Sequence, residues 1–193
     1  MPKTNGSGQA RVLTPQQLDA LIHAAPSPAH RACWAVMRYT GSRISETLQL
    51  RWGAIHDDRI TFCGATTKTR RTREPMMAAA LRQELQRYQH WWEMTYQERA
   101  KGRQLLFPSP GSKAVPMTRQ AVDRALRGAV ERLALPSGVS LHTFRRSLAT
   151  TMAQRGASLR TVQSFTGHRS LGQLQTYIDI TEQDQRAALL LIC

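Results

Sequence analysis

Helix start and stop signals follow one another at short intervals in this chain, and they constrain its fold more than any other feature. The first predicted helix opens with Thr14 as its N-cap, a proline at the first helical position and Gln17 completing a capping box. Pro26 ends that helix. A second helix is predicted over residues 28–39 and stops at Gly41. The chain is therefore expected to fold as a series of short helices.

The rest of the chain mostly continues this helical pattern. Further helices are predicted at about 43–50, 78–98, 119–134, 141–155, 159–166, 171–178 and 182–192. One stretch differs, because β-prone runs flank the turn at Asp57 and Asp58 and are followed by "TREPMM", which predicts a small antiparallel sheet with "ATTKTRRT" as a turn. "LLFPSPGSKAVP" is predicted to be a loop. The expected fold class is mainly α with a small antiparallel β-sheet, comprising a flexible tail over 1–10 and one domain over 11–180.

Length and composition exclude several classes of protein. A chain of 193 residues fits one domain, and 41% hydrophobic residues are enough for a core. No apolar run is long enough to span a membrane, and the first ten residues lack the apolar segment of a secretory signal. Three cysteines without a CxxC spacing argue against a disulfide framework or a zinc site. We therefore expect a cytoplasmic protein with no membrane partner.

The charge balance is the first indication of function. Lysines and arginines number 27 against 13 acidic residues, which gives a formal net charge of +14. Such a surplus repels itself in a compact domain unless a polyanion is bound. Nucleic acid is the leading candidate, because phosphates attract arginine and release counterions on binding. An anionic membrane surface is a weaker candidate, since no clear basic amphipathic helix with an exposed aromatic face is present.

The stretch "SLHTFRRSLATTMAQRG" places a charge where a helix should be apolar. Phe144 and Leu148 belong to the buried stripe, and Arg145 falls inside that sector, whereas Arg146 points towards water. A guanidinium at such a position is costly unless an anion meets it, and no acidic residue occurs between positions 131 and 179. His142 is close enough on the helix to share one cleft with Arg145. The alternative is an arginine that extends out of the core beside an ordinary helix-start histidine.

Two other basic segments also have either a structural role or a role in binding an anion. Arg43 begins a short helix after a Gly-Ser break, where it either pairs with Glu46 or directs a second guanidinium at the same anion. Lys68 stands at the start of the turn "TTKTRRTRE", and a β-hairpin tip can reach a DNA groove. The arginines of that turn fit a solvated run that contacts phosphates: Arg70, Arg71 and Arg73.

The stretch "TGHRSLGQLQTYIDI" ends this series of basic motifs. Leu171, Leu174 and Ile178 form an apolar helical stripe, and Tyr177 lies beside it, nine residues after His168. From this pattern alone, Tyr177 is either a core aromatic or a residue whose hydroxyl takes part in chemistry.

Taken in order, these motifs resemble the catalytic domain of the tyrosine recombinases, the phage integrase family of site-specific DNA recombinases. The similarity rests on "TGSRISETLQLRW", a lysine on a hairpin, "HTFRRSLAT", "TGHRS" and a tyrosine nine residues after that histidine, and it runs from about residue 13 to 181. Each motif is common alone, but the ordered set is specific. The resemblance implies six catalytic residues: Arg43, Lys68, His142, Arg145, His168 and Tyr177.

The resemblance also implies a mechanism. Tyr177 would attack a phosphodiester to form a 3′-phosphotyrosyl link, while Arg43, Arg145 and a neutral His168 neutralise the developing charge. Lys68 would protonate the leaving 5′ hydroxyl, and His142 would assist proton removal from Tyr177 or hold the pocket. No metal, cofactor or ATP is expected. Double-stranded DNA is the expected partner, with backbone contacts from Arg70, Arg71, Arg73, Arg146 and Arg169.

The C-terminal helix bears on how the chain assembles. The helix after residue 181 is expected to pack on its own domain or to dock into a neighbouring subunit, within a tetramer on DNA that accessory DNA-bending proteins can assist. Family members usually have an N-terminal helical domain, so this chain is expected to be a short form, a catalytic fragment or a relic. The alternatives are a non-catalytic DNA-binding regulator of the same fold and an enzyme like type IB topoisomerases. A metal nuclease is disfavoured, because no acidic cluster has the required spacing.

Overall fold

The computed structural model describes residues 8–67, 71–168, 170–175, 186, 189 and 190. Helices dominate these residues: α1 (Pro15–His23), α2 (Pro28–Thr40), α3 (Ile44–Leu48), α4 (Ala79–Tyr96), α5 (Arg119–Arg132), α6 (His142–Gln154), α7 (Leu159–Thr166) and α8 (Leu171–Gln175). Single 3₁₀ turns lie at η1 (Trp52–Ala54) and η2 (Gly64–Thr66). Strands β1 (Pro108–Ser109) and β2 (Ser112–Pro116) form an antiparallel pair. The predicted fold class, mainly α with a small antiparallel sheet, is confirmed.

The predicted helix starts and ends agree closely with the structure where the local signals are strong. Thr14 caps α1 and forms a capping box with Gln17, as expected. Gly41 ends α2 in the left-handed conformation, at a φ of 61°, which a residue without a Cβ adopts readily. The helix predicted over 43–50 is shorter than expected, with Arg43 at its N-cap position. Most of the predicted helix over 182–192 and most of the predicted 1–10 tail lie outside the described residues.

The position of the sheet differs from the prediction. The segment 105–116, predicted as a loop, contains the β1–β2 hairpin, with Pro110 and Gly111 between the two strands. A Pro-Gly pair is a strong turn signal, but proline is unfavourable within strands. Because both flanking strands contain a proline, the hairpin was not predicted. The predicted sheet around residues 55–77 is present only as isolated antiparallel bridges. The β-prone residues there do not form a continuous hydrogen-bonded ladder, because β-propensity depends strongly on context. These bridges join Ile55 to Ile60, Arg59 to Met76 and Phe62 to Arg73.

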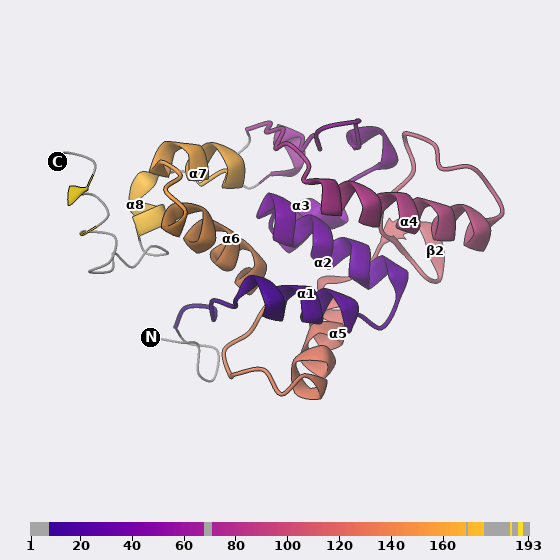
Figure 1. Cartoon of the computed structure of the whole chain (residues 1–193). Coiled ribbons are helices and arrows are strands. Elements are labelled where there is room, and N and C mark those ends of the chain that lie inside the picture. Colours follow the sequence, from indigo (N-terminus) through magenta and orange to yellow (C-terminus); the bar gives the residue numbers. More distant parts are fainter. Residues whose placement is uncertain (1–7, 68–70, 169, 176–185, 187–188, 191–193) are drawn as a thin grey trace.

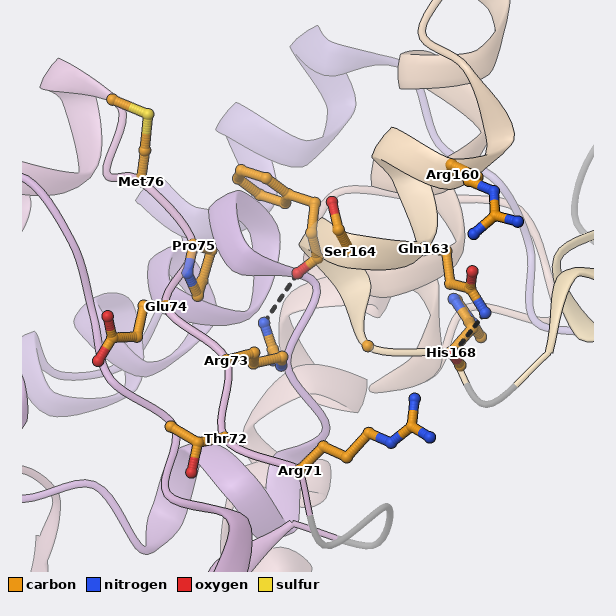
Figure 2. Close-up of a pocket in the computed structure, with 12 residues that line it drawn as sticks. Arg71, Thr72, Arg73, Glu74, Pro75, Met76, Arg160, Gln163, Ser164 and His168 are labelled. Carbon is orange, nitrogen blue, oxygen red and sulfur yellow. Dashed lines mark hydrogen bonds between the residues drawn. The ribbon is translucent and has the colours of Figure 1, made fainter.

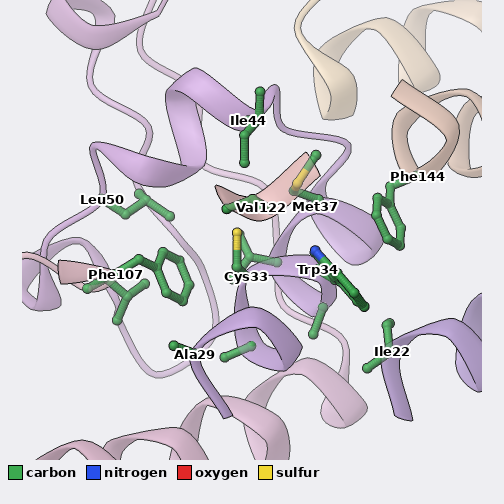
Figure 3. Packing of buried hydrophobic residues seen from close by; sticks show 14 of the residues in the cluster. Ile22, Ala29, Cys33, Trp34, Met37, Ile44, Leu50, Phe107, Val122 and Phe144 are labelled. Carbon is green, nitrogen blue, oxygen red and sulfur yellow. The ribbon is translucent and has the colours of Figure 1, made fainter. Parts of the chain in front are cut away.

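Helix α2 lies at the centre of the molecule, with α1, α4 and α6 packed around it (Figure 1). Its side chains Cys33, Trp34 and Met37 are buried in the main apolar cluster (Figure 3). Phe144 reaches this cluster from α6 and stacks on Trp34, with 6.3 Å between ring centroids. This contact joins the central helix to the helix that carries His142 and Arg145.

A second, smaller apolar cluster is formed by the helices at the other end of α6. Its buried members are Ala149, Val162 and Leu174, from α6, α7 and α8. Figure 1 shows α7 and α8 grouped around α6, away from α4. Polar side chains lie where the ends of α2 and α7 meet, between the two clusters, and they include Arg145 and His168.

Replacing Phe144 should test how strongly the central helix depends on α6. Because this ring is fully buried, Phe144→Ala should lower the free energy of unfolding by about 3–5 kcal/mol through lost packing and a cavity. Denaturant titration measures the change. Met94→Ala is the control, since Met94 is 61% exposed and its loss should cost no more than about 0.5 kcal/mol. Equal effects of the two variants would contradict the assigned packing.

Candidate active site

Among the described residues of the predicted set, Arg145 is the most deeply buried cation. Its residue is 3% exposed, as its place in the apolar sector of α6 predicted, and it does not extend into solvent. Its Nη1 donates to two main-chain carbonyls, Gly41 O at 2.7 Å and Thr166 O at 2.6 Å. The compensating groups are therefore carbonyls at the ends of α2 and α7, which explains how the charge is buried without a nearby acid on its own stretch of chain.

His168 lies against Arg145 and is held in a neutral form. Arg145 Nε donates to His168 Nε2 at 3.2 Å, and Nδ1 lies 2.6 Å from Thr166 Oγ1. Thr166 Oγ1 donates in turn to Val162 O, which leaves its lone pairs for the Nδ1 proton. Burial, followed by the charges of Arg145, Arg43 and Arg73, lowers the pKa of His168 to about 3. The imidazole is therefore uncharged at neutral pH.

Arg43 enters the same region from the start of α3. Its Nη1 donates to Glu46 Oε1 at 2.8 Å, and its main-chain N–H donates to Glu46 Oε2 at 3.1 Å. The expected pair with Glu46 thus forms, and the Arg43 side chain stays 19% exposed, so it can also face an anion. Burial works to raise the pKa of Glu46, but the hydrogen bonds from Arg43 and the charges of Arg73 and Arg43 outweigh it and lower that pKa.

A pocket of about 880 Å³ opens beside His168. It lies between the segment 71–76 and α7 with the residues that follow it. Figure 2 shows Arg71, Arg160, Gln163 and His168 gathered on one side, with Glu74, Pro75 and Met76 on the other. Arg71 and Arg160 are exposed, so the side nearest His168 is rich in donors and positive charge and suits an anion.

Two of the predicted DNA contacts have other surroundings than expected. Arg73 was predicted to be solvated, but its side chain is only 8% exposed and binds Glu46, Thr40 O and Phe165 O. Arg146 was expected to point towards water, but it is half-buried and donates to the carbonyl of Ala10. In both cases the expectation of a solvated side chain is wrong, because distant backbone carbonyls, invisible in a local pattern, meet the guanidinium.

The remaining predicted site residues are placed in part. His142 is exposed on the first turn of α6, the helix that also carries Arg145. Four predicted residues lie outside the described residues: Lys68, Arg70, Arg169 and Tyr177. The sequence did not single out Glu46 as more than a partner of Arg43, nor Thr166, Arg160 and Gln163 as site residues. For Thr166, the only sequence signal of its contact with His168 was its position two residues before that histidine.

The described part of the chain contains no group of three His, Cys, Asp or Glu side chains that could hold a metal ion. No described helix is both long and apolar enough to cross a bilayer.

Comparison with known proteins identifies the family. The model of the phage integrase family matches residues 11–184, and the chain therefore belongs to that family. Tyrosine recombinase XerC of Anoxybacillus flavithermus is 29% identical over 184 residues, covering 92% of this chain and 60% of the relative. XerC of Brucella melitensis is 32% identical over 143 residues, covering 74% and 44%. The chain thus spans about half the length of these curated relatives.

A solved structure supports the same fold. The Tn1549 transposon integrase in complex with circular intermediate DNA superposes with a TM-score of 0.77 at 20% identity, covering 97% of this chain and 68% of that chain. The fold is therefore that of a tyrosine recombinase catalytic domain.

The low pKa of His168 should make acid destabilise the protein. His168 binds a proton near pH 6.5 in the unfolded chain but only near pH 3 in the folded protein. The free energy of unfolding should therefore fall as the pH drops between these values. The slope contributed is at most about 1.4 kcal/mol per pH unit. Denaturant titrations of wild type and His168→Gln from pH 7 to pH 4 measure it. Parallel pH profiles of the two proteins would contradict the assignment.

Proposed function

We propose that this chain is a site-specific DNA recombinase of the tyrosine class, which breaks and rejoins DNA strands through a 3′-phosphotyrosyl intermediate. The observation that carries the proposal is the convergence of Arg145, Arg43 and a neutral histidine beside a basic pocket, in a chain of the phage integrase family. Relatives named recombinases favour strand exchange over a regulator or a relaxing enzyme.

The proposed cleavage needs one covalent nucleophile, Tyr177, and depends mainly on neutralising the charge that develops on the phosphate. The Tyr177 oxygen would attack phosphorus and the 5′ oxygen would leave, taking a proton that Lys68 supplies. Arg43 and Arg145 would stabilise the charge on the non-bridging oxygens, as guanidinium forks do for phosphates. The 5′ hydroxyl of a partner strand would then attack the phosphotyrosine and release Tyr177, so no external energy source is needed.

The contacts of His168 suit a donor that is never charged. In the DNA-free protein its Nε2 accepts from Arg145, with the proton on Nδ1. To donate to a phosphate oxygen, the ring would hold the proton on Nε2 instead. The Thr166 hydroxyl could then rotate from Val162 O and donate to Nδ1, while the Nε–H of Arg145, which Nε2 would no longer accept, would turn to the phosphate. His142, on the exposed first turn of α6, would assist proton transfer from Tyr177.

The partners follow from this reaction. Double-stranded DNA would bind through the exposed Arg71 and Arg160 beside the pocket, and through Arg70 and Arg169. Arg73 and Arg146 are not proposed as phosphate contacts, because Arg73 is paired with the Glu46 carboxylate and the half-buried Arg146 is held against the Ala10 carbonyl. Exchange between two duplexes requires several active sites at once, so we expect a tetramer on DNA, which accessory DNA-bending proteins would help to shape. Since its proposed substrate is DNA, we propose that the enzyme acts in the cytoplasm.

Loss of the Tyr177 hydroxyl should abolish covalent attachment to DNA while leaving binding nearly intact, because the ring remains. The substrate is a library of nicked duplexes with a randomised centre, and denaturing gels detect protein-linked DNA formed by wild type but not by Tyr177→Phe. Tyr96→Phe is the matched control, since Tyr96 packs on Trp92 in α4, and it should react like wild type. Phosphotyrosyl DNA formed by Tyr177→Phe would rule out this nucleophile.

Cleavage should proceed in excess EDTA and without ATP. Arginine and lysine side chains supply the positive charge that a metal supplies in nucleases, and the phosphotyrosyl link retains the energy of the broken bond. The same library, incubated with EDTA and with added Mg²⁺, measures the effect. Activity that is lost on chelation and restored by Mg²⁺ would instead indicate a metal nuclease.

A further inference from the structure

Helices α2 and α7 end side by side, and each ends in the same way. Gly41 follows α2 with a φ of 61°, and Gly167 follows α7 with a φ of 73°. The last carbonyls of a helix lack partners within it and carry partial negative charge. Close approach needs the glycine at position 41, because a Cβ there would lie 3.1 Å from Thr166 Cγ2.

Two arginines bind these helix ends in parallel. Arg145 bridges the carbonyls of Gly41 and Thr166. One residue earlier on each helix, Arg73 Nη1 bridges the carbonyls of Thr40 at 3.2 Å and Phe165 at 2.9 Å. The contact to Phe165 is drawn in Figure 2. We call Arg73, Arg145 and these four carbonyls the arginine clasp.

Arg73 also binds a carboxylate and an aromatic ring. Its Nη2 donates to Glu46 Oε2 at 3.3 Å, and the other oxygen of Glu46 accepts from Arg43. Its guanidinium lies over the Phe62 ring, 4.1 Å from the centroid. The side chain therefore connects α2, α7 and the carboxylate that holds Arg43.

The clasp stands immediately before two residues of the proposed active site. His168 follows Gly167 directly, and Arg43 lies two residues after Gly41. Gly167 packs on the Arg73 stem, since a Cβ there would lie 2.9 Å from Arg73 Cδ. A shift of Arg73 would therefore move the backbone that sets both His168 and Arg43.

We propose that Arg73 is a positioning residue for strand cleavage, which fixes His168 through the end of α7 and Arg43 through Glu46. This rests on the proposed recombinase function. A direct contact with DNA does not fit, because both Nη atoms of Arg73 donate to protein groups and its charge is paired with the Glu46 carboxylate, whereas the acceptors of Arg145 given above are uncharged. Lysine would not replace it, because a single ammonium cannot hold two carbonyls and a carboxylate in the planar arrangement of a guanidinium.

The test compares Arg73→Lys and Arg73→Met with Arg59→Lys. Arg59 is a matched control on the neighbouring bridge, because its side chain is 46% exposed and pairs only with Asp58 among its described ion pairs. Rates of covalent attachment at saturating DNA and dissociation constants are measured on a nicked duplex that wild type selects from the randomised library. Amide hydrogen exchange at Gly41 and Gly167 is measured without DNA, with the middle of α4 as the internal reference.

Both Arg73 variants should fold and bind the duplex within about twofold of wild type, while the attachment rate falls roughly tenfold to a hundredfold from misplacement. Exchange at Gly41 and Gly167 should accelerate roughly tenfold, as expected for one lost hydrogen bond, with α4 unchanged. Arg59→Lys should match wild type in every measurement.

Three results would overturn the proposal. A wild-type rate in Arg73→Lys would mean that charge alone suffices. Weaker DNA binding with an unchanged saturating rate would make Arg73 a DNA contact. Failure of both Arg73 variants to fold would make the residue part of the fold's stability. If wild type itself forms no covalent complex, the recombinase function fails, but the exchange measurement still decides whether Arg73 holds the helix ends.

Discussion

The bond between a guanidinium and a helix-end carbonyl is the interaction on which the arrangement of the site depends. Arg145 and Arg73 each satisfy carbonyls of α2 and α7 that no intrahelical donor can reach. The apolar cluster of α6, α7 and α8 is separate from the main core, so apolar packing alone does not set α7 against α2. Polar bonds between fixed backbone groups set that relation, and they give the site its geometry.

The same arrangement decides which groups at the site are charged. Arg145, Arg43 and Arg73 crowd around His168 and, together with burial, keep its ring neutral. Glu46 is buried beside two of these arginines and stays ionised, so it offsets part of their repulsion. A phosphate entering the pocket would meet cations already held apart, which is the preorganisation that electrostatic catalysis requires.

Local signals predicted the helices, and the ordered motifs that resemble the integrase family predicted the candidate site residues. The capping box at Thr14, the stop at Gly41 and the inward position of Arg145 all depend on residues within one turn of each other. The burial of Arg73 could not be predicted in this way, because its partners are 33 and 92 residues away in the chain. The β1–β2 hairpin was missed because its strands are short and one ends in proline.

The acceptors of the arginine clasp belong to the main chain, and this makes its tolerance to sequence change unequal. Substitution of Thr40, Phe165 or Thr166 leaves their carbonyl oxygens in place, provided that the two helices still end there. The donors have no such protection, since any replacement of Arg73 or Arg145 removes the guanidinium itself. The carbonyl side of this junction therefore constrains the sequence little, whereas the two arginines and the glycine that lets the helices meet constrain it strongly. Thr166 is constrained separately, through its hydroxyl on His168.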